Sequence, residues 1–210
     1  MQNTPDIKVP KRILNTLLSS LYAGVVPRVG APYIAIGRTE ELTAMLSSLD
    51  HVAEGGAAVR FLIGRYGSGK SFLIQLVRGY AMERNFLCAD CDLSTDQRRL
   101  CGSDGAGTAT YRELLRNLAC KTSPDGGALP TVLSGHYGQI LGKLAEKGVY
   151  PESAGFREAL SGEIMRTFKA LQNNVGGFDF SRVVSEYFFA DAEDNEEKKN
   201  ACLRWLRGEF

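Results

Sequence analysis

The sequence predicts an α/β fold whose C-terminal half is rich in helices. A mostly apolar run at residues 58–63, a glycine-rich stretch, an amphipathic segment and a second extended run follow one another within about 35 residues. This is the order of a βαβ unit. Beyond Asp92 the apolar residues recur only at helical spacing, so we expect a sheet that is incomplete within this chain.

The N-terminal segment predicts two helices separated by a loop. Ile13, Leu17 and Leu21 recur at helical spacing, and a cluster of glycines and prolines follows at residues 24–32. A second helix is predicted from Thr39, which is a suitable N-cap residue, and Gly55-Gly56 ends it.

The predicted βαβ unit occupies residues 58–92. Residues 58–63 have the apolar character of a strand that is buried on both faces. The helix that starts near Ser71 carries one apolar face and is closed by Asn85. Residues 86–92 then predict a second strand.

Helical periodicity continues to the end of the chain. The apolar stripes that predict these helices include Tyr111 to Leu118, Leu133 to Leu144, Phe156 to Leu171, Val183 to Phe188, and Leu203 with Leu206. We interpret these stripes as packing faces. The predicted organisation is therefore an N-terminal helical segment with an adenine-side box (1–57), a βαβ unit with a phosphate loop (58–94) and a helical insertion or extension of the same domain (95–210).

Composition limits the classes of function. Of the 210 residues, 44% are hydrophobic and 23% are charged, as in soluble globular proteins. A formal charge of +1 gives no indication of a nucleic acid or membrane partner, although a local patch that contacts DNA stays open. No apolar stretch approaches the roughly 18 residues of a membrane span, and no secretory signal is evident. We therefore expect a cytoplasmic protein.

The five cysteines are expected to be free thiols. Cys88 and Cys91 form a CxxC pair, but no second close pair of cysteine or histidine ligands accompanies it. In a strand their odd spacing places them on opposite faces. A zinc site is therefore not predicted.

One motif predicts chemistry directly. Gly64-Arg65-Tyr66-Gly67-Ser68-Gly69-Lys70-Ser71 matches the pattern GxxxxGK[ST] in full, between a predicted strand and a predicted helix. Glycines allow the backbone N–H groups of such a loop to converge on phosphates. We expect Lys70 to reach the β- and γ-phosphates, which makes it the candidate catalytic residue, and Ser71 to bind Mg²⁺. The predicted ligand is ATP with Mg²⁺.

Hydrolysis also requires an acidic side chain near the magnesium ion and the attacking water. The second predicted strand ends in acid, so Asp90 or Asp92 is a candidate. Its polar alternation is nevertheless more typical of an edge strand. Asp191, at the end of a helical pattern, is a weaker candidate.

Several segments carry a resemblance to a known family. They are Val26-Pro27-Arg28-Val29-Gly30, Ile36-Gly37-Arg38-Thr39-Glu40-Glu41-Leu42, GRYGSGKSFL, Asp92-Leu93-Ser94, TYRELLRNLA and SPDGGALP. With these segments the chain resembles the ATP-binding P-loop proteins of bacterial BREX-type phage-defence clusters and, through them, the AAA+ ATPases. The resemblance implies that Ile36, Gly37 and Arg38 line the adenine pocket, since a GRxxE box lies beside the base in AAA+ relatives. An exposed helix start remains the alternative for Arg38.

The resemblance also identifies a departure from the family pattern. Family members continue into an apolar strand that ends in Asp-Glu, into sensor residues and into an arginine finger, and this chain ends before them. It therefore resembles the N-terminal portion of a longer protein. Without the intervening strands, residues 58–63 and 86–92 would either pair directly or leave apolar edges exposed, which favours self-association.

The leading hypothesis is an ATP-binding, AAA+-like ATPase subunit of a bacterial anti-phage defence complex. Hydrolysis would require the acidic strand to be supplied outside this chain. One alternative is a nucleotide-dependent switch or scaffold without turnover. Another is a small-molecule P-loop kinase, for which Arg98 and Arg99 in a polar loop are weak support. The expected partners are the nucleotide and other subunits or further copies of the chain, with no membrane.

Overall fold

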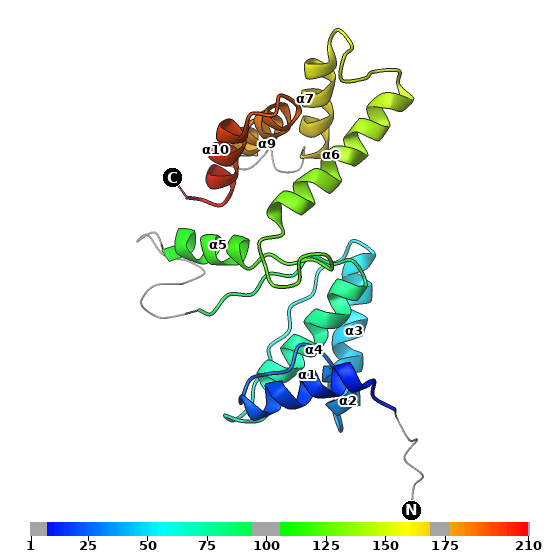
Figure 1. Ribbon diagram of the computed structural model, residues 1–210, viewed down its shortest axis with the longest axis vertical. Helices are drawn as coiled ribbons and strands as arrows, with labels where there is room; N and C mark the ends of the chain where they lie inside the picture. Colours follow the sequence, from blue (N-terminus) through cyan, green and yellow to red (C-terminus); the bar gives the residue numbers. More distant parts are fainter. Residues whose placement is uncertain (1–7, 94–105, 169–176, 210) are drawn as a thin grey trace, which may run out of the picture. The chain divides into compact units, whose positions relative to one another are not determined.

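The computed structural model describes residues 8–93, 106–168 and 177–209. The chain divides into two compact units, Met1–Cys88 and Ala89–Phe210 (Figure 1). Arg98, Arg99 and Cys101 lie outside the described residues. Within the described ranges no helix has both the length and the apolar character needed to cross a membrane.

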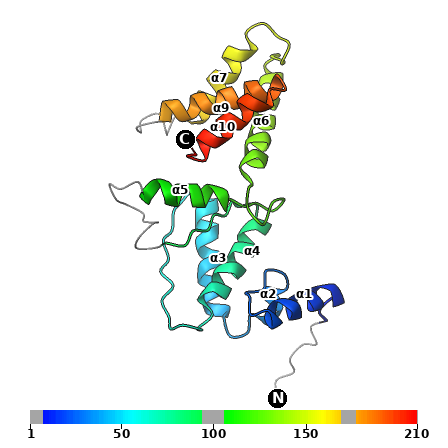
Figure 2. The same ribbon diagram turned by 60° about the vertical axis from the view of Figure 1, so that its left-hand side comes forward.

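Within residues 8–88, the described part of the first unit, the chain forms four helices and the loops that join them. They are α1 (Lys11–Tyr22), α2 (Ala31–Ile34), α3 (Thr39–Ala53) and α4 (Lys70–Glu83). α3 and α4 lie side by side in both views (Figures 1 and 2), and α2 also contacts α4. A small core of Ala31, Leu73 and Leu76 joins α2 to the inner face of α4. The apolar face predicted for the α4 segment is thus the face that packs.

The second unit contains a larger helical core. Its described helices are α5 (Ala106–Arg116), α6 (Leu129–Glu146), α7 (Phe156–Thr167), α9 (Gly177–Ala192) and α10 (Glu196–Leu206). α9 packs on both α7 and α10, and α6 packs on α7. Leu160, Ile164 and Phe188 are fully buried in this core, and the ring of Tyr137 stacks on Phe188 with 4.7 Å between centroids. The prediction of a helical C-terminal half is confirmed.

Local sequence signals mark the ends of two helices, and the structure corrects a third. Pro130 lies in the first turn of α6, where a missing N–H is tolerated. Asn85 follows α4 with φ of 62°, a left-handed conformation that asparagine adopts more readily than most residues. Pro151 is a residue type that favours the first turn of a helix, but α7 begins only at Phe156, after the N-cap residue Gly155, which has a left-handed conformation.

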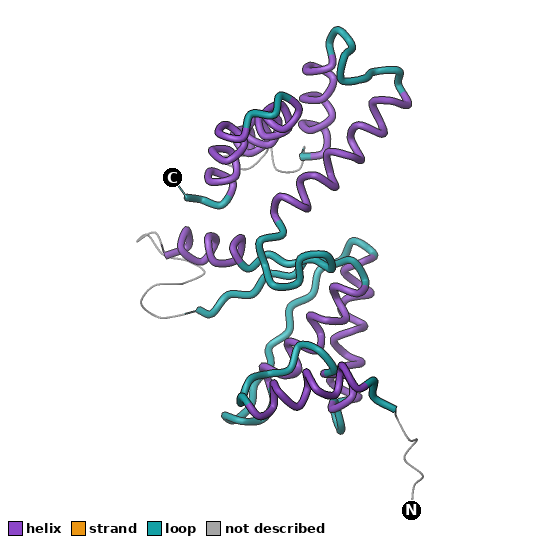
Figure 3. Tube along the Cα trace, viewed as in Figure 1, coloured by secondary structure: helices purple, strands orange, loops and turns teal. Residues whose placement is uncertain are grey.

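The two predicted strands are not formed in the described part of the chain. The described residues contain no strand, and residues 58–63 and 86–92 are drawn as loop (Figure 3). Val59, Phe61 and Ile63 are 79%, 86% and 91% exposed, whereas Leu62 packs against the α4 core. The alternation expected of a strand is present, but a strand also needs a neighbour to receive its hydrogen bonds. Of the predicted βαβ unit only the helix is formed, and the apolar edge expected of an incomplete sheet is exposed.

Candidate functional site

The glycine-rich loop curls over the start of α4. Gly67 and Gly69 adopt φ values of 77° and 84°, a region that costs other residues about 1–2 kcal/mol. Gly69 is also the N-cap residue of α4. At Gly64 an added Cβ would lie 2.6 Å from Ser68 Oγ. Each of the three glycines in the motif therefore has a steric or conformational reason to be glycine.

The loop delivers the chain into the N-terminus of α4. The first N–H groups of a helix have no partner within the helix, and the macrodipole adds partial positive charge there. Because α4 begins at Lys70, the ammonium group of this side chain adds a full positive charge at the same place. A glycine loop, a helix N-terminus and a lysine together make a site for anions.

Lys70 is turned back onto its own loop. Its Nζ donates to the carbonyl oxygen of Gly64 at 2.9 Å and to that of Arg65 at 2.8 Å. Ser68 N donates to the same Arg65 carbonyl at 3.2 Å, which closes a turn across the loop. The ammonium group is thus held within the loop by neutral acceptors. The side chain of Tyr66, at the apex of this turn, is fully exposed.

Arg38 links the start of α3 to the same loop. Its Nη2 donates to the backbone carbonyl of Ser68, and its Nη1 lies 2.9 Å from Glu41 Oε1. Glu41 accepts a hydrogen bond from its own backbone and one from Arg38, and both lower the pKa of its carboxyl group. The structure therefore places Arg38 against the glycine loop, where it contacts Ser68, a residue 30 positions later in the chain.

The other residues of the predicted adenine box are less involved. Gly37 adopts φ of 71°, which turns the chain between α2 and α3. The side chain of Ile36 is almost fully exposed to solvent. Of residues 36–38, the structure thus brings Arg38 to the loop and leaves Ile36 outside any described core.

A cavity of about 410 Å³ adjoins the loop at Ser71. Ser71 and Gln75 line it from α4, and three valines line it from the loop between α1 and α2. Those valines are Val25, Val26 and Val29. Two of them lie in the segment that carries the family resemblance, but the sequence analysis gave them no role. Only tertiary contacts show that this segment lines the same cavity as Ser71 at the end of the glycine loop.

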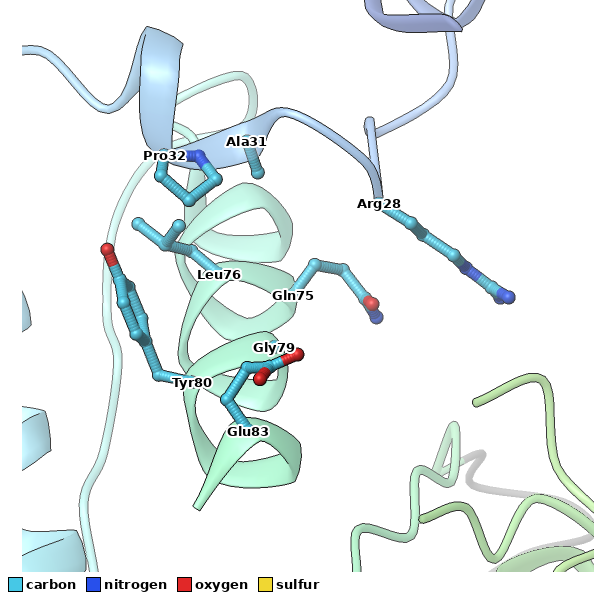
Figure 4. Close-up of a pocket in the computed structure, with 8 residues that line it drawn as sticks. All are labelled: Arg28, Ala31, Pro32, Gln75, Leu76, Gly79, Tyr80 and Glu83. Carbon is cyan, nitrogen blue, oxygen red and sulfur yellow. The ribbon is translucent and has the colours of Figure 1, made fainter. Parts of the chain in front are cut away.

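A second cavity, of about 210 Å³, lies further along α4 (Figure 4). Pro32 and Tyr80 enclose its apolar end, and Glu83 lies at its polar end. Arg28 and Gln75 line both cavities, and Figure 4 shows their side chains extending to the same side of the helix. No residue of the glycine loop is among those that line this cavity. Its volume is also smaller than the roughly 300 Å³ of ordinary ligand pockets.

The acidic residues that are candidates for magnesium binding make contacts in the second unit. Asp90 and Asp92 belong to the second unit, where Asn117 Nδ2 donates to the backbone carbonyl of Asp90 at 2.9 Å. Asp191 Oδ1 lies 2.5 Å from Lys199 Nζ, and this hydrogen bond raises the pKa of Lys199. Asp191 thus forms an ion pair between α9 and α10.

The cysteines in the described part of the chain are free thiols. Cys88 Sγ lies 3.8 Å from the carbonyl oxygen of Arg78, and Cys91 Sγ lies 3.7 Å from that of Asp92. Cys202 is buried in the helical core. Among the described residues, no group of three or more histidine, cysteine or acidic side chains is arranged to hold a metal ion.

A glycine loop at a helix N-terminus, with a lysine in the first turn, defines an anion-binding class of site. Comparison with known proteins identifies the family. The sequence profile of the BREX system ATP-binding protein BrxC/D matches residues 9–210, and the chain belongs to this family. No curated protein and no solved structure matches the chain at a significant level. The predicted resemblance to BREX ATP-binding proteins is confirmed.

Proposed function

We propose that the chain is an ATP-binding, AAA+-like ATPase subunit of a bacterial anti-phage defence complex in the cytoplasm. The observation that carries the proposal is the position of Lys70, whose ammonium group is held in the glycine loop at the start of α4. Family membership supports ATP as the ligand. The helix-rich architecture supports the proposed extension over residues 95–210.

The loop fits the triphosphate of ATP on steric and electrostatic grounds. Gly67 and Gly69 add no side chains to the loop, and Lys70 has two neutral carbonyl acceptors that phosphate oxygens can replace. Arg38 donates to the Ser68 carbonyl of the loop, and Ile36, Gly37 and Arg38 would line the adenine side of the site. Ser71 is exposed at the second position of α4, and its hydroxyl would hold Mg²⁺. ATP supplies the phosphoryl group for transfer to water.

The proposed core would resemble a P-loop NTPase once residues 58–63 acquire sheet neighbours. Residues 1–57 would carry the base side of the site, and residues 58–94 would carry the phosphate loop. Asp90 or Asp92 would be the first candidate for the magnesium shell within this chain. A catalytic acid and an arginine finger would otherwise come from another segment or subunit.

Substitution of Lys70 by alanine tests the proposal. A hydrogen bond to a charged group contributes about 1.5–3 kcal/mol, so we expect ATP to bind at least about tenfold more weakly to Lys70→Ala than to the parent. Isothermal titration calorimetry with ATP and Mg²⁺ measures this change. Lys143→Ala is the matched control, since it removes the same charge from an exposed position on α6. Equal affinity for the parent and Lys70→Ala would contradict the proposal.

A nucleotide-dependent switch without turnover is the second candidate function. The ion pair between Asp191 and Lys199 supports this alternative. It occupies one of the three acidic residues that are candidates for assisting hydrolysis. Release of phosphate from ATP at a rate that Lys70→Ala abolishes would select the ATPase. Binding of ATP without phosphate release would select the switch.

A further inference from the structure

The guanidinium group of Arg38 bridges two parts of the first unit. Its Nη1 donates to Glu41 Oε1 at 2.9 Å, and its Nη2 donates to the backbone carbonyl of Ser68. Glu41 lies in the first turn of α3, whereas Ser68 lies in the glycine loop directly before Gly69, the N-cap residue of α4. The planar fork of the arginine therefore connects the start of one helix to the loop that leads into the next.

We propose that Arg38 is a positioning residue for the glycine loop, and that it acts on phosphate binding through the Ser68 carbonyl. This role rests on the proposed function, since it concerns the same loop. A peptide unit is planar and trans, so the contact that holds the Ser68 carbonyl also fixes the direction of the Gly69 N–H. A phosphate loop binds its ligand through N–H groups that converge on one point. Arg38 thus sets the orientation of an N–H group of the loop from outside the loop.

The loop itself leaves this orientation open. Gly67 and Gly69 flank Ser68, and glycine populates positive and negative φ about equally readily. Inside the loop, Ser68 N donates to the Arg65 carbonyl at 3.2 Å, which is at the long end of the range for such bonds. A contact from a residue outside the loop therefore favours the observed φ values of 77° and 84° over the alternatives.

The surroundings of Arg38 do not favour direct binding of a phosphate group. Both of its terminal nitrogens already have acceptors, and the carboxylate of Glu41 offsets its charge. A hydrogen bond from its own backbone and one from Arg38 lower the pKa of the Glu41 carboxyl group, which keeps this carboxylate ionised near neutral pH. Arg38 therefore contributes its geometry to the site, and little net charge.

Glu41 allows a test whose sign separates positioning from direct anion binding. Loss of a carboxylate beside an anion site should by itself strengthen anion binding. Positioning by Arg38 with the help of Glu41 predicts the opposite, so Glu41→Ala should weaken the binding of tripolyphosphate by roughly two- to fivefold, the range of a partly exposed ion pair. Isothermal titration calorimetry measures this change. Glu40→Ala is the matched control, because Glu40 carries the same charge in the same turn of α3, and its affinity should equal or exceed that of the parent.

Substitutions of Arg38 test the guanidinium group itself. A hydrogen bond from a charged donor changes an equilibrium constant by roughly tenfold or more, so Arg38→Ala should bind both ATP and tripolyphosphate about tenfold more weakly than the parent. Arg38→Lys should be similarly weak, because lysine keeps the charge but lacks the fork that reaches two acceptors. Arg84→Ala is the control. Arg84 caps the other end of α4 and pairs with Asp50 of α3 at 2.6 Å, so its loss should leave both affinities unchanged.

Hydrogen exchange in the absence of any ligand gives a second readout. The Ser68 amide closes the turn across the loop, and its exchange rate reports how often this turn opens. Exchange measured by NMR should be about tenfold faster at Ser68 in Arg38→Ala and unchanged in Arg84→Ala. An unchanged rate at Ser68, or an equal increase at every amide of α4, overturns the inference, because neither result places the effect in the loop.

The binding outcomes separate this inference from the proposed function. If Lys70→Ala weakens the binding of ATP and Arg38→Ala does not, the phosphate site stands and the inference is overturned. Weaker binding of ATP but not of tripolyphosphate by Arg38→Ala assigns the side chain to the base and overturns it, as does parent affinity in Arg38→Lys. Binding of tripolyphosphate by Glu41→Ala that is as tight as that of the parent, or tighter, overturns it as well. If the parent binds neither ligand, both proposals fail.

Discussion

Three glycine-to-alanine substitutions on and next to α4 separate backbone strain from side-chain crowding. Gly69 adopts φ of 84°, and an added Cβ would lie 3.1 Å from Nη2 of Arg38. The left-handed conformation alone costs alanine about 1–2 kcal/mol. The close contact adds to this cost, because Arg38 must move away from the Ser68 carbonyl that it holds. Gly69→Ala should therefore destabilise the first unit by about 1–3 kcal/mol.

The other two positions act as internal controls. Gly67 has a similar φ of 77° but open space around its Cβ position, so Gly67→Ala should lose only the backbone contribution of about 1–2 kcal/mol. Gly79 lies inside α4, also with open space around a Cβ, so Gly79→Ala should stabilise the helix by about 0.5–1 kcal/mol. The expected order of stability is Gly79→Ala, parent, Gly67→Ala, Gly69→Ala.

Differential scanning calorimetry measures this order. For a unit of this size, 1 kcal/mol corresponds to a shift of about 4–8 °C in melting temperature, so a loss of about 1–3 kcal/mol should make Gly69→Ala melt roughly 4–24 °C below the parent. The Gly79→Ala protein should melt a few degrees above it. A Gly69→Ala protein as stable as the parent, or a Gly79→Ala protein less stable than the parent, would refute the assigned backbone geometry.

Two further predictions concern charge and association. The hydrogen bond from Lys147 lowers the pKa of Glu163 below its usual value of 4.5. The ionised Glu163 therefore stabilises the fold above pH 4.5, and this stability is lost as the pH falls through the lowered pKa of the folded protein. The melting temperature of the parent should exceed that of Glu163→Gln near neutral pH, and the difference should shrink below pH 4.5; a pH-independent difference contradicts this. Phe61 is 86% exposed in a segment that lies outside any helix or strand. Such an apolar segment can pair with another chain, so Phe61→Lys should remove a concentration-dependent increase in sedimentation coefficient. Tyr22→Lys, at another exposed aromatic residue, should leave the increase unchanged, and a parent that is monomeric at every concentration contradicts the prediction.

The helices could be predicted from the sequence because their determinants are local. Apolar spacing along α4 and α6, with Pro130 and Asn85 at helix ends, identifies these elements without knowledge of the rest of the chain. The strands could not be confirmed in the same way, because a strand depends on a partner that is distant in sequence. Residues 58–63 keep the alternation of a strand, with Leu62 packed and Phe61 exposed, but have no ladder to complete it.

The same distinction applies to the candidate site. The pattern of residues 64–71 predicts a loop with left-handed glycines at the start of a helix, and the structure has that loop. The contact of Arg38 with the Ser68 carbonyl spans 30 residues, and the cavity combines α1, α4 and the valine segment. Neither feature follows from spacing along the chain. Features that depend on one segment can therefore be predicted from the sequence, whereas contacts between distant segments require the packed structure.

The geometry of Lys70 also determines what the loop should prefer. Its ammonium group now interacts with two neutral carbonyl oxygens, of Gly64 and Arg65. A phosphate oxygen carries a negative charge that a carbonyl oxygen lacks, so exchange of these carbonyls for phosphate oxygens adds a Coulomb attraction to each hydrogen bond and favours the bound state. A single phosphate reaches one part of this arc, whereas a triphosphate can engage the helix N-terminus, the left-handed glycines and the lysine together. The loop should therefore bind polyphosphates more tightly than inorganic phosphate, even in the absence of a sheet, because the groups that define its shape all lie between Arg38 and Ser71.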